Sequence, residues 1–343
     1  MCMSDLFNKL LILRTAGIGP VKYSALIKRF GTVTLAAESL NADIALRDAV
    51  RYEMEMAEKM GVVYLSDDDA RYPENLRMVK NHPPVITVRG NLEVLKKPLV
   101  SIVGTRHATV AGMGFIANLA EGIVNTGAAV VSGMAIGTDT AAHRGALRAN
   151  GDAQTIAVLA GGVDYIWPLE NESLYYEILQ RGAVISEMPV GFVPVATNFV
   201  QRNRWVAALA DKLILGEADL KSGSMTTARF AIDYERDLWA IPSHPADLRA
   251  VGPNSLIRSG HAKLCVGLSD FSEIGKNNNF VEKKLVENDG ENNLLDCLGT
   301  NPVSESVLAE VVKKSIAEIK HDLVVLELQG MVQKVDGGYI RLS

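Results

Sequence analysis

The feature that most constrains the fold is a series of short apolar segments between residues 84 and 241, separated by glycine-bearing loops and helical stretches. Most of these segments are apolar throughout, which is typical of strands buried between two layers of helices. The repeated alternation of strand and helix predicts an α/β fold with a doubly wound, Rossmann-like, mostly parallel sheet. The expected strands are PVITV (84–88), LVSIV (99–103), AAVVS (128–132), TIAVLA (155–160), AVISE (183–187), KLILG (212–216) and DLWAI (237–241), and the expected helices are 112–125, 138–149, 171–181, 199–210 and 224–235.

Residues 1–65 are expected to form short helices in front of this central domain, which we place at 66–275. The segment GIGPVKYSALIKRFG (17–31) has two glycines, a proline at a first-turn position and apolar residues at helical spacing. This pattern predicts either a helix–hairpin–helix or an ordinary turn between two packed helices. A helix–hairpin–helix can direct backbone N–H groups at a DNA phosphate.

The C-terminal part of the chain differs in composition from the rest. Residues 276–293 contain six asparagines and few apolar residues, which indicates a linker. Residues 294–343 are again apolar at regular spacing, and a DGG sequence there predicts a β-hairpin. Three helices followed by a hairpin predict a winged helix, with the helices expected at 294–298, 304–312 and 315–328.

Composition limits the classes of protein to which the chain can belong. Hydrophobic residues make up 48% of its 343 residues and charged residues 22%, as in globular proteins, and the length suits about two domains. Its three scattered cysteines argue against a zinc site or a disulfide framework. No stretch reaches 18 apolar residues, so we expect neither a membrane protein nor a secreted one, but a cytoplasmic one. The net charge of −5, with no basic segment, means that any nucleic acid must bind in a local pocket.

Glycines, hydroxyl groups and cations follow three of the expected strands. Gly104, Thr105 and Arg106 follow the strand at 99–103, and Ser132 and Gly133 end the strand at 128–132. Because the carboxyl ends of parallel strands meet at one edge of a sheet, we expect these loops to converge. Backbone N–H groups, helix N-termini and cations together predict a site for phosphate or a nucleotide. The third loop supplies Lys221, Ser222, Gly223 and Ser224.

Two arginines flank an asparagine in NFVQRNRWVAALAD (198–211). Arg202, Asn203 and Arg204 are placed at the start of the helix expected over 199–210. Cations are unfavourable at a helix N-terminus, so this arrangement indicates an anionic partner. Arginine also matches phosphate oxygens better than lysine does.

Other candidate side chains are open to two interpretations. Tyr165 and Trp167 follow the strand at 155–160, where they either stack on nucleobases or pack against the next helix. Asp139 and His143 lie four residues apart and match a metal site or an acid–base pair, but a first-turn carboxylate and a packed histidine explain them better.

The motifs of several enzyme classes are absent from the sequence or misplaced in it. The Gly112-x-Gly114-x-x-Ala117 string resembles a dinucleotide fingerprint but lies eight residues after its strand. Neither GxxxxGK[ST] nor GxSxG occurs. We therefore expect no cofactor, no bound metal and no catalytic residues.

Seven motifs, taken in order, resemble those of the DNA-processing protein A family (DprA, also called Smf). The resemblance runs from about Arg71 to Ala262. The flanks resemble the longer members of the family, which have a SAM-like helix–hairpin–helix module in front and a winged helix behind. The motifs are VSIVGTR, VVSGMAIGTDTAAHRGAL, TIAVLAGGVDYIWPLEN, VISEMP, FVQRNRWVAALAD, EADLKSGSMTTARFA and VGPNSLIRSGHA.

The resemblance implies a bacterial cytoplasmic protein that binds single-stranded DNA without catalytic turnover. It implies that the protein protects incoming strands during natural transformation, loads RecA recombinase onto them, and forms homodimers through the Rossmann-like domain. It places Leu256 and Ile257 at the dimer contact. Two positions depart from the family pattern, with Val200 in place of proline and Trp167 in place of tyrosine. The residues implied to contact DNA are Gly104, Thr105, Arg106, Ser132, Gly133, Trp167, Arg202, Asn203, Arg204, Lys221, Ser222, Gly223 and Ser224.

Two other functions are compatible with parts of the sequence. A Rossmann-type nucleotide phosphoribohydrolase, similar to the LOG proteins, would also have an anion pocket, but its PGGxGTxxE motif is missing. A winged helix can also bind duplex DNA. Its second long helix, however, carries Glu318, Asp322 and Glu327 against Lys320 alone, which suits a phosphate-lined groove poorly. Docking to a protein suits that module better.

Overall fold

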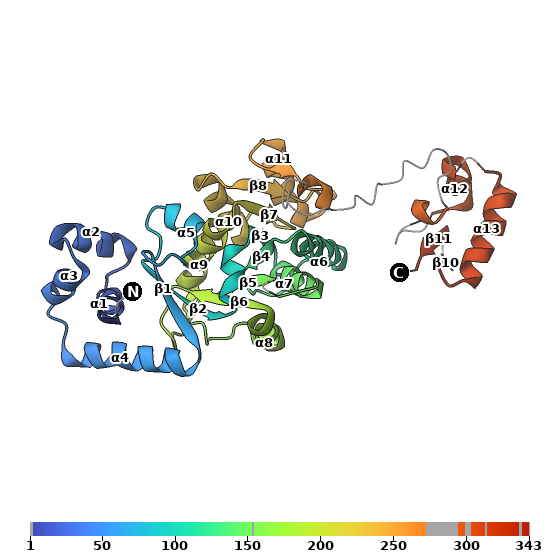
Figure 1. Ribbon diagram of the computed structural model, residues 1–343. Coiled ribbons are helices and arrows are strands. Elements are labelled where there is room, and N and C mark those ends of the chain that lie inside the picture. Colours follow the sequence, from blue (N-terminus) through green and yellow to red (C-terminus); the bar gives the residue numbers. More distant parts are fainter. Residues whose placement is uncertain are drawn as a thin grey trace. The chain divides into compact units, whose positions relative to one another are not determined.

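The computed structural model consists of two compact units, one within residues 1–278 and one within 279–343 (Figure 1). The linker expected at 276–293 lies outside the described residues. Each unit is treated by itself below. The residues that the structure describes are 3–152, 154–271, 294–298, 303–312, 314–335 and 338–342.

The first unit is built on a nine-stranded sheet with the order β1-β2-β6-β5-β4-β3-β7-β8-β9. Every pair of neighbouring strands among β3 to β9 is parallel. Strand β2 pairs with β6, and β1 with β2, in the antiparallel direction. The doubly wound, mostly parallel sheet is therefore confirmed. Its strands are β1 (Val62–Ser66), β2 (Val85–Gly90), β3 (Leu99–Val103), β4 (Ala129–Ser132), β5 (Thr155–Val158), β6 (Gly182–Ser186), β7 (Lys212–Leu215), β8 (Asp237–Ala240) and β9 (Lys263–Leu264).

All seven expected strands form, and two unexpected strands join them. Strand β1 lies in a region expected to contain only helices, so that expectation is wrong there. Its β-branched and aromatic residues favour an extended conformation, and all five of its residues pair with β2. The domain boundary expected at 65/66 falls inside this strand.

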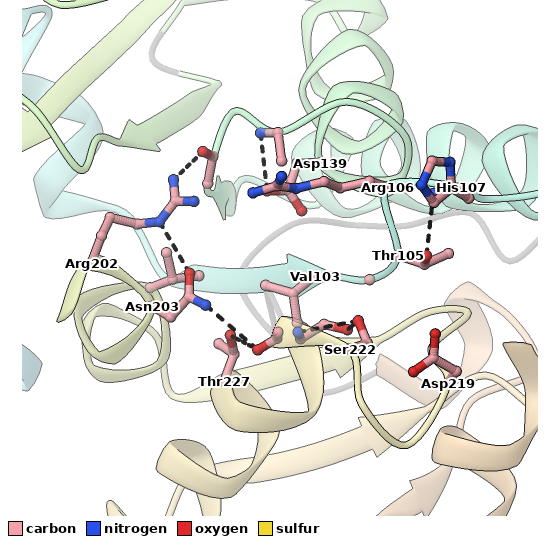
Figure 2. A pocket seen from close by; sticks show the side chains of 16 residues that line it. Val103, Thr105, Arg106, His107, Asp139, Arg202, Asn203, Asp219, Ser222 and Thr227 are labelled. Carbon is pink, nitrogen blue, oxygen red and sulfur yellow. Dashed lines mark hydrogen bonds between the residues drawn. The ribbon is translucent and has the colours of Figure 1, made fainter. Parts of the chain in front are cut away.

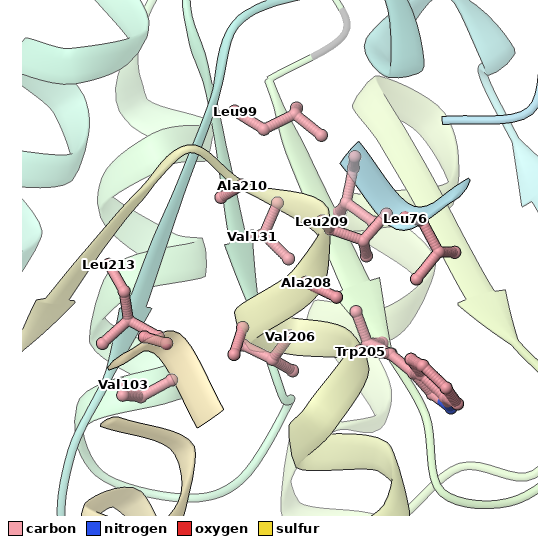
Figure 3. Close-up of a cluster of buried hydrophobic side chains, with 14 of the residues drawn as sticks. Leu76, Leu99, Val103, Val131, Trp205, Val206, Ala208, Leu209, Ala210 and Leu213 are labelled. Carbon is pink, nitrogen blue, oxygen red and sulfur yellow. The ribbon is translucent and has the colours of Figure 1, made fainter. Parts of the chain in front are cut away.

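Alternate side chains of each central strand enter two separate cores, as expected for a sheet that is covered on both faces. Val100 and Ile102 of β3 pack with helices α6 (Val110–Asn125) and α7 (Thr138–Arg148). Leu99 and Val103 of the same strand belong to the opposite core. That core also contains Trp205, Val206 and Leu209 of helix α9 (Figure 3). The remaining helices of this domain are α5 (Glu74–Met78), α8 (Glu172–Arg181), α9 (Ala196–Leu209), α10 (Gly223–Asp233) and α11 (Val251–Arg258).

Four helices precede the sheet and share a core with it. Leu10, Leu11 and Ile12 of the first helix are fully buried in a cluster that also contains residues of β5 and β6. Lys9 is 3% exposed, and its ammonium group lies 3.3 Å from the Asp67 carboxylate. The N-terminal helices are thus held by apolar burial and by the ion pairs of a buried lysine with the more exposed Asp67 and Asp68. They are α1 (Met3–Arg14), α2 (Pro20–Phe30), α3 (Val33–Ser39) and α4 (Ile44–Lys59).

The second unit has the elements expected of a winged helix. Two α-helices, α12 (Glu305–Val312) and α13 (Ile316–Leu328), precede an antiparallel pair of strands, β10 (Val332–Val335) and β11 (Gly338–Arg341). Ser315 and Glu318 cap α13 reciprocally, which fixes where that helix begins. Residues 294–297, expected to be α-helical, form a 3-10 turn instead.

The close packing of α6 on α7 yields a prediction. A Cβ atom at Gly145 would lie 2.6 Å from the Cα atom of Ala117 on the facing helix, so Gly145→Ala must push the helices apart. We expect it to lower the free energy of unfolding by about 1–3 kcal/mol. Gly114→Ala, on α6, is the matched control, because a Cβ there meets nothing within 4 Å. It should stabilise the protein by up to about 1 kcal/mol. Denaturant titration of both variants measures the difference, and equal effects would contradict this account of the helix contact.

Candidate functional site

A cavity of about 280 Å³ lies at the carboxyl edge of the sheet, where the chain order reverses between β3 and β7. Open α/β sheets bind their ligands at such a switch point. Three expected loops contribute to its lining: Gly104 to Arg106 after β3, Gly133 after β4, and Ser222 to Ser224 after β7. Arg202 and Asn203 of α9 line it as well (Figure 2). The structure therefore brings together most of the residues named from the sequence.

The start of α10 forms one wall of the cavity. Ser222 is the N-cap of this helix, and its hydroxyl group accepts a hydrogen bond from the Ser224 backbone N–H. Gly223, the first residue of the helix, lines the cavity beside these two serines. The positive end of an eleven-residue helix thus faces the cavity, which favours an anion there.

Arg106 is the exposed cation of the site. Its guanidinium carbon lies 4.9 Å from the centroid of the Trp167 ring. Trp167 in turn meets Phe199 edge-on, with ring centroids 4.6 Å apart. This packing holds the arginine beside an aromatic surface and supplies a cation–π interaction. Trp167 therefore packs on α9 and not on the next helix along the chain, α8, and it remains half-buried.

Arg202 is placed differently from the prediction. Helix α9 begins at Ala196, so Arg202 and Arg204 lie beyond its first turn, and the argument from an unfavourable helix N-terminus is wrong. Arg202 is 6% exposed and donates hydrogen bonds to the carbonyl oxygens of Gly133 and Val158. Burial lowers its pKa to about 10, and the neighbouring Asp139 carboxylate opposes that shift. The positive charge of Arg202 is therefore largely compensated by the two carbonyl oxygens and the Asp139 carboxylate.

Four residues named from the sequence lie outside the cavity lining: Trp167, described above, and Ser132, Arg204 and Lys221. Ser132 is fully buried and donates its hydroxyl hydrogen to the Ile102 carbonyl oxygen at 2.7 Å. Lys221 is exposed in the loop before α10. Arg204 turns to another face of α9, where its Nε donates to the Tyr234 hydroxyl group at 3.1 Å. Spacing along the chain did not show these orientations, because they depend on which face of each element is packed.

Several lining residues were not assigned to the site from the sequence. Asp139 was interpreted as a first-turn carboxylate, and the structure places it in the first turn of α7, buried next to Arg202. Burial raises the pKa of Asp139, and Arg202 limits that rise. His107 also lines the cavity, and its position directly after Arg106 could have indicated this from the sequence. The full set of such residues is Val103, His107, Ala135, Asp139, Val206, Asp219 and Thr227.

A carboxylate from inside the protein occupies the start of α6, where a dinucleotide fold would hold its pyrophosphate. Glu217 follows β7 and accepts hydrogen bonds from the Thr109 N–H at 2.7 Å and from the Thr109 hydroxyl group. Its backbone carbonyl accepts from the Thr105 N–H at 2.7 Å. Glu217 thus fills one anion site and fixes both ends of the loop that carries Arg106. This contact also gives a reason for the glycine at position 112 of the Gly112-x-Gly114-x-x-Ala117 string. A Cβ atom at Gly112 would lie 2.7 Å from the Glu217 carboxylate oxygen.

His143 is sealed in the core and does not reach the cavity. Its Nδ1 lies 2.8 Å from the hydroxyl oxygen of Thr155, which itself donates to the Val130 carbonyl oxygen. The histidine must therefore donate from Nδ1, and its Nε2 is left without a partner. Burial and the nearby Arg202 charge lower its pKa to about 3. The packed interpretation of His143 is thus confirmed.

Fold and site together define a class: Rossmann-like proteins whose sheet has, at its switch point, a cavity lined by glycine-bearing loops, a helix N-terminus and arginines. Residues 63–275 match the family model of DNA recombination-mediator protein A, and residues 284–338 match that of the DprA winged helix domain. The chain belongs to the DNA recombination-mediator protein A family, as its resemblance to DprA and Smf indicated, and the winged helix is confirmed.

Individual relatives agree with this assignment. The chain is 33% identical over 284 residues to Protein Smf of Synechocystis, covering 77% of this chain and 71% of that protein. It is 37% identical over 202 residues to DNA processing protein DprA of Streptococcus pneumoniae, covering 59% and 70%.

Solved structures of family members resemble this chain. The X-ray structure of DprA from S. pneumoniae superposes with a TM-score of 0.67 at 28% identity, covering 78% of this chain and 97% of that one. DprA from Helicobacter pylori, described with a single-stranded DNA binding mode, gives a TM-score of 0.56 at 32% identity and covers 62% and 94%. Within the described part of this chain, no helix is long and apolar enough to cross a membrane.

The buried histidine yields a prediction about pH. The native pKa of His143 lies near 3, below its ordinary value of 6.5, so between these values the unfolded chain binds a proton that the native protein does not. His143 should therefore make the free energy of unfolding fall as the pH is lowered through this window, by up to about 1.4 kcal/mol per pH unit. We expect His143→Gln to lose that part of the slope. Denaturant titrations at several pH values between about 4 and 7 measure it, and equal slopes in both proteins would refute the assignment.

Proposed function

We propose that this protein binds single-stranded DNA in the cavity at the switch point, with a backbone phosphate between the Gly104–Arg106 loop and the start of α10. The observation that carries the proposal is the convergence of an exposed arginine, an open helix N-terminus and a glycine loop on one cavity. These groups neutralise an anion without recognising a base. Family membership supports DNA as the source of that anion.

The aromatic side chains beside the cavity support a strand rather than free phosphate. Trp167 is half-buried and already carries Arg106 on its ring. A nucleobase can stack on such a surface, contributing roughly 1–3 kcal/mol. Asn203, which lines the cavity, can donate or accept a further hydrogen bond to the strand. Gly104, Thr105, Gly133, Ser222, Gly223 and Ser224 supply backbone and hydroxyl groups, while Ser132 and Arg202 support the site from beneath.

The wider role that we propose follows the family. The protein acts in the cytoplasm as a homodimer, protects incoming strands during natural transformation and loads RecA recombinase onto them. It acts by binding, without turnover. Two observations support the proposal that the protein has no catalytic turnover: His143 is buried away from the cavity, and the Asp139 carboxyl group is engaged with Arg202. Among the residues that the structure describes, no cluster of acidic, histidine or cysteine side chains could hold a metal ion.

The two rival functions have less support. A LOG-like phosphoribohydrolase needs a carboxylate that is free to act on the sugar. The two acids in the cavity lining are Asp139, which is buried, and Asp219, whose carboxylate accepts from the Lys221 backbone N–H at 2.7 Å. The winged helix presents acidic Glu318 and Asp322 on α13, which disfavours a duplex DNA groove.

Removing the exposed cation should weaken binding in a defined way. We expect Arg106→Ala to reduce affinity for oligothymidylate and for mixed-sequence DNA alike, by about tenfold. It should also flatten the slope of log affinity against log salt by about 0.7, the value for one single-strand phosphate. Fluorescence anisotropy at several salt concentrations measures both quantities.

Arg144→Ala is the matched control for this experiment. Arg144 is an exposed arginine of α7 outside the cavity lining, so its loss should leave the slope unchanged. If the slope is the same for the wild-type protein and Arg106→Ala, the phosphate lies elsewhere. A parallel assay for nucleotide hydrolysis tests the proposal that the protein has no turnover.

The proposed dimer is tested on α11. Leu256 and Ile257 are half-buried, and both pack partly against the core of the sheet domain. If they also form the dimer contact, Leu256→Glu should give a folded monomer by light scattering, with its circular dichroism retained. An unfolded variant would show that the side chain serves the core, and an unchanged dimer would refute the contact.

A further inference from the structure

A second, larger groove of about 760 Å³ lies along α9. One wall is the loop between α1 and α2 together with the start of α2, from Leu13 to Lys22. The other wall is formed by residues 83–85, by Glu187 to Pro189 after β6, and by Arg204 and Trp205 of α9. Its volume falls within the range of ligand-binding sites. The groove is separate from the cavity described above, and its first wall contains the start of the segment 17–31 for which a helix–hairpin–helix was one expectation.

We propose that this groove is a second nucleotide subsite for the same single strand of DNA, which reaches it by passing around α9. The inference rests on the proposed function of the first cavity.

The two cavities share one helix. Asn203 and Val206 of α9 line the first cavity, whereas Gln201 and Arg204 line the groove. At 100° per residue these pairs face roughly opposite sides of the helix, whose diameter with side chains is about 10–12 Å. A strand held in the first cavity therefore has only the thickness of one helix to cross. Val200, which is 51% exposed, lies on the N-terminal half of α9 where such a strand would pass.

The charges around the groove favour a polyanion. Among the described residues, neither Lys22 nor Arg204 has a carboxylate within ion-pair distance. Arg14 also lines the groove, but the Glu53 carboxylate holds it through two hydrogen bonds of 2.8 Å. Because the Arg204 Nε already donates to Tyr234, Lys22 and the Nη groups of Arg204 are the cationic groups that remain for phosphates.

The remaining lining suits nucleobases. Phe192, Pro189 and the two prolines at 83–84 offer flat apolar surfaces of the kind on which bases stack. Glu187 is the acid of the groove and would repel a phosphate, but its carboxyl group can accept a hydrogen bond from the N3–H of thymine or from an exocyclic amino group of another base. Phosphates at Lys22 and Arg204 with bases toward Phe192 and Glu187 satisfy both sets of groups.

The length of the oligonucleotide separates the two sites. An oligothymidylate of about four nucleotides should fill the first cavity alone, whereas one of about twelve should reach the groove as well. We expect Lys22→Ala in the full chain to weaken binding of the longer oligonucleotide about threefold and to flatten its salt slope by about 0.7. Binding of the shorter one should not change. Arg204→Gln should act in the same direction, and salt-titrated anisotropy measures both.

Lys28→Ala is the matched control, because Lys28 lies on the same helix α2 but does not line the groove. Lys22 is exposed, so its loss should leave the fold intact and keep the test decisive even if Arg204→Gln lowers stability. Wild-type binding of the longer oligonucleotide by both Lys22→Ala and Arg204→Gln would overturn the second subsite. Failure of the wild-type protein to bind either oligonucleotide would instead overturn the proposed function on which the inference rests.

Discussion

The carboxyl edge of this sheet depends on one buried cation. The Arg202 guanidinium group contacts the carbonyl oxygens that end two neighbouring strands and lies beside Asp139 at the start of α7. Burying a charge is costly unless it is paired and hydrogen-bonded, so these elements must remain in place together. Gly133 is part of the same arrangement, because a Cβ there would lie 2.6 Å from the guanidinium nitrogen. A fixed edge of this kind holds the exposed groups around the cavity in position.

The same edge departs from a dinucleotide-binding Rossmann fold at one carboxylate. The usual phosphate position at the start of α6 is filled by the Glu217 carboxylate, which caps that helix through Thr109. The anion is proposed to bind instead at the start of α10, where Ser222 and Gly223 begin a helix with no carboxylate in its first turn. One internal carboxylate therefore both fills the position that a dinucleotide phosphate would take and fixes the loop that carries Arg106. The cavity and the groove on either side of α9 are the surfaces at which we propose that the strand binds.

Helices were easier to predict from the sequence than the directions of their side chains. Apolar periodicity gave α6, α7 and α10 to within two residues, because each must bury one face against the sheet. The start of α9 was placed three residues late, since Ala196 to Asn198 carry no apolar pattern and no serine, threonine, aspartate or asparagine precedes them as a cap. That small error reversed the meaning of Arg202, from an exposed first-turn cation to a buried structural one. Strand β1 was missed for a related reason, because it follows α4 after only two residues.

The sequence by itself determined the α/β class, the order of the elements and the three loops at the carboxyl edge, because continuous apolar strands can only be buried in a sheet covered on both faces. It also identified the family. Only the tertiary structure decided which of the named cations meet solvent. Arg106, Arg202 and Arg204 are alike in sequence, yet one lies exposed on Trp167, one is buried under the edge and one faces a second groove. The environment of a charged side chain depends on the packing of distant segments around it, and local spacing along the chain does not contain that information.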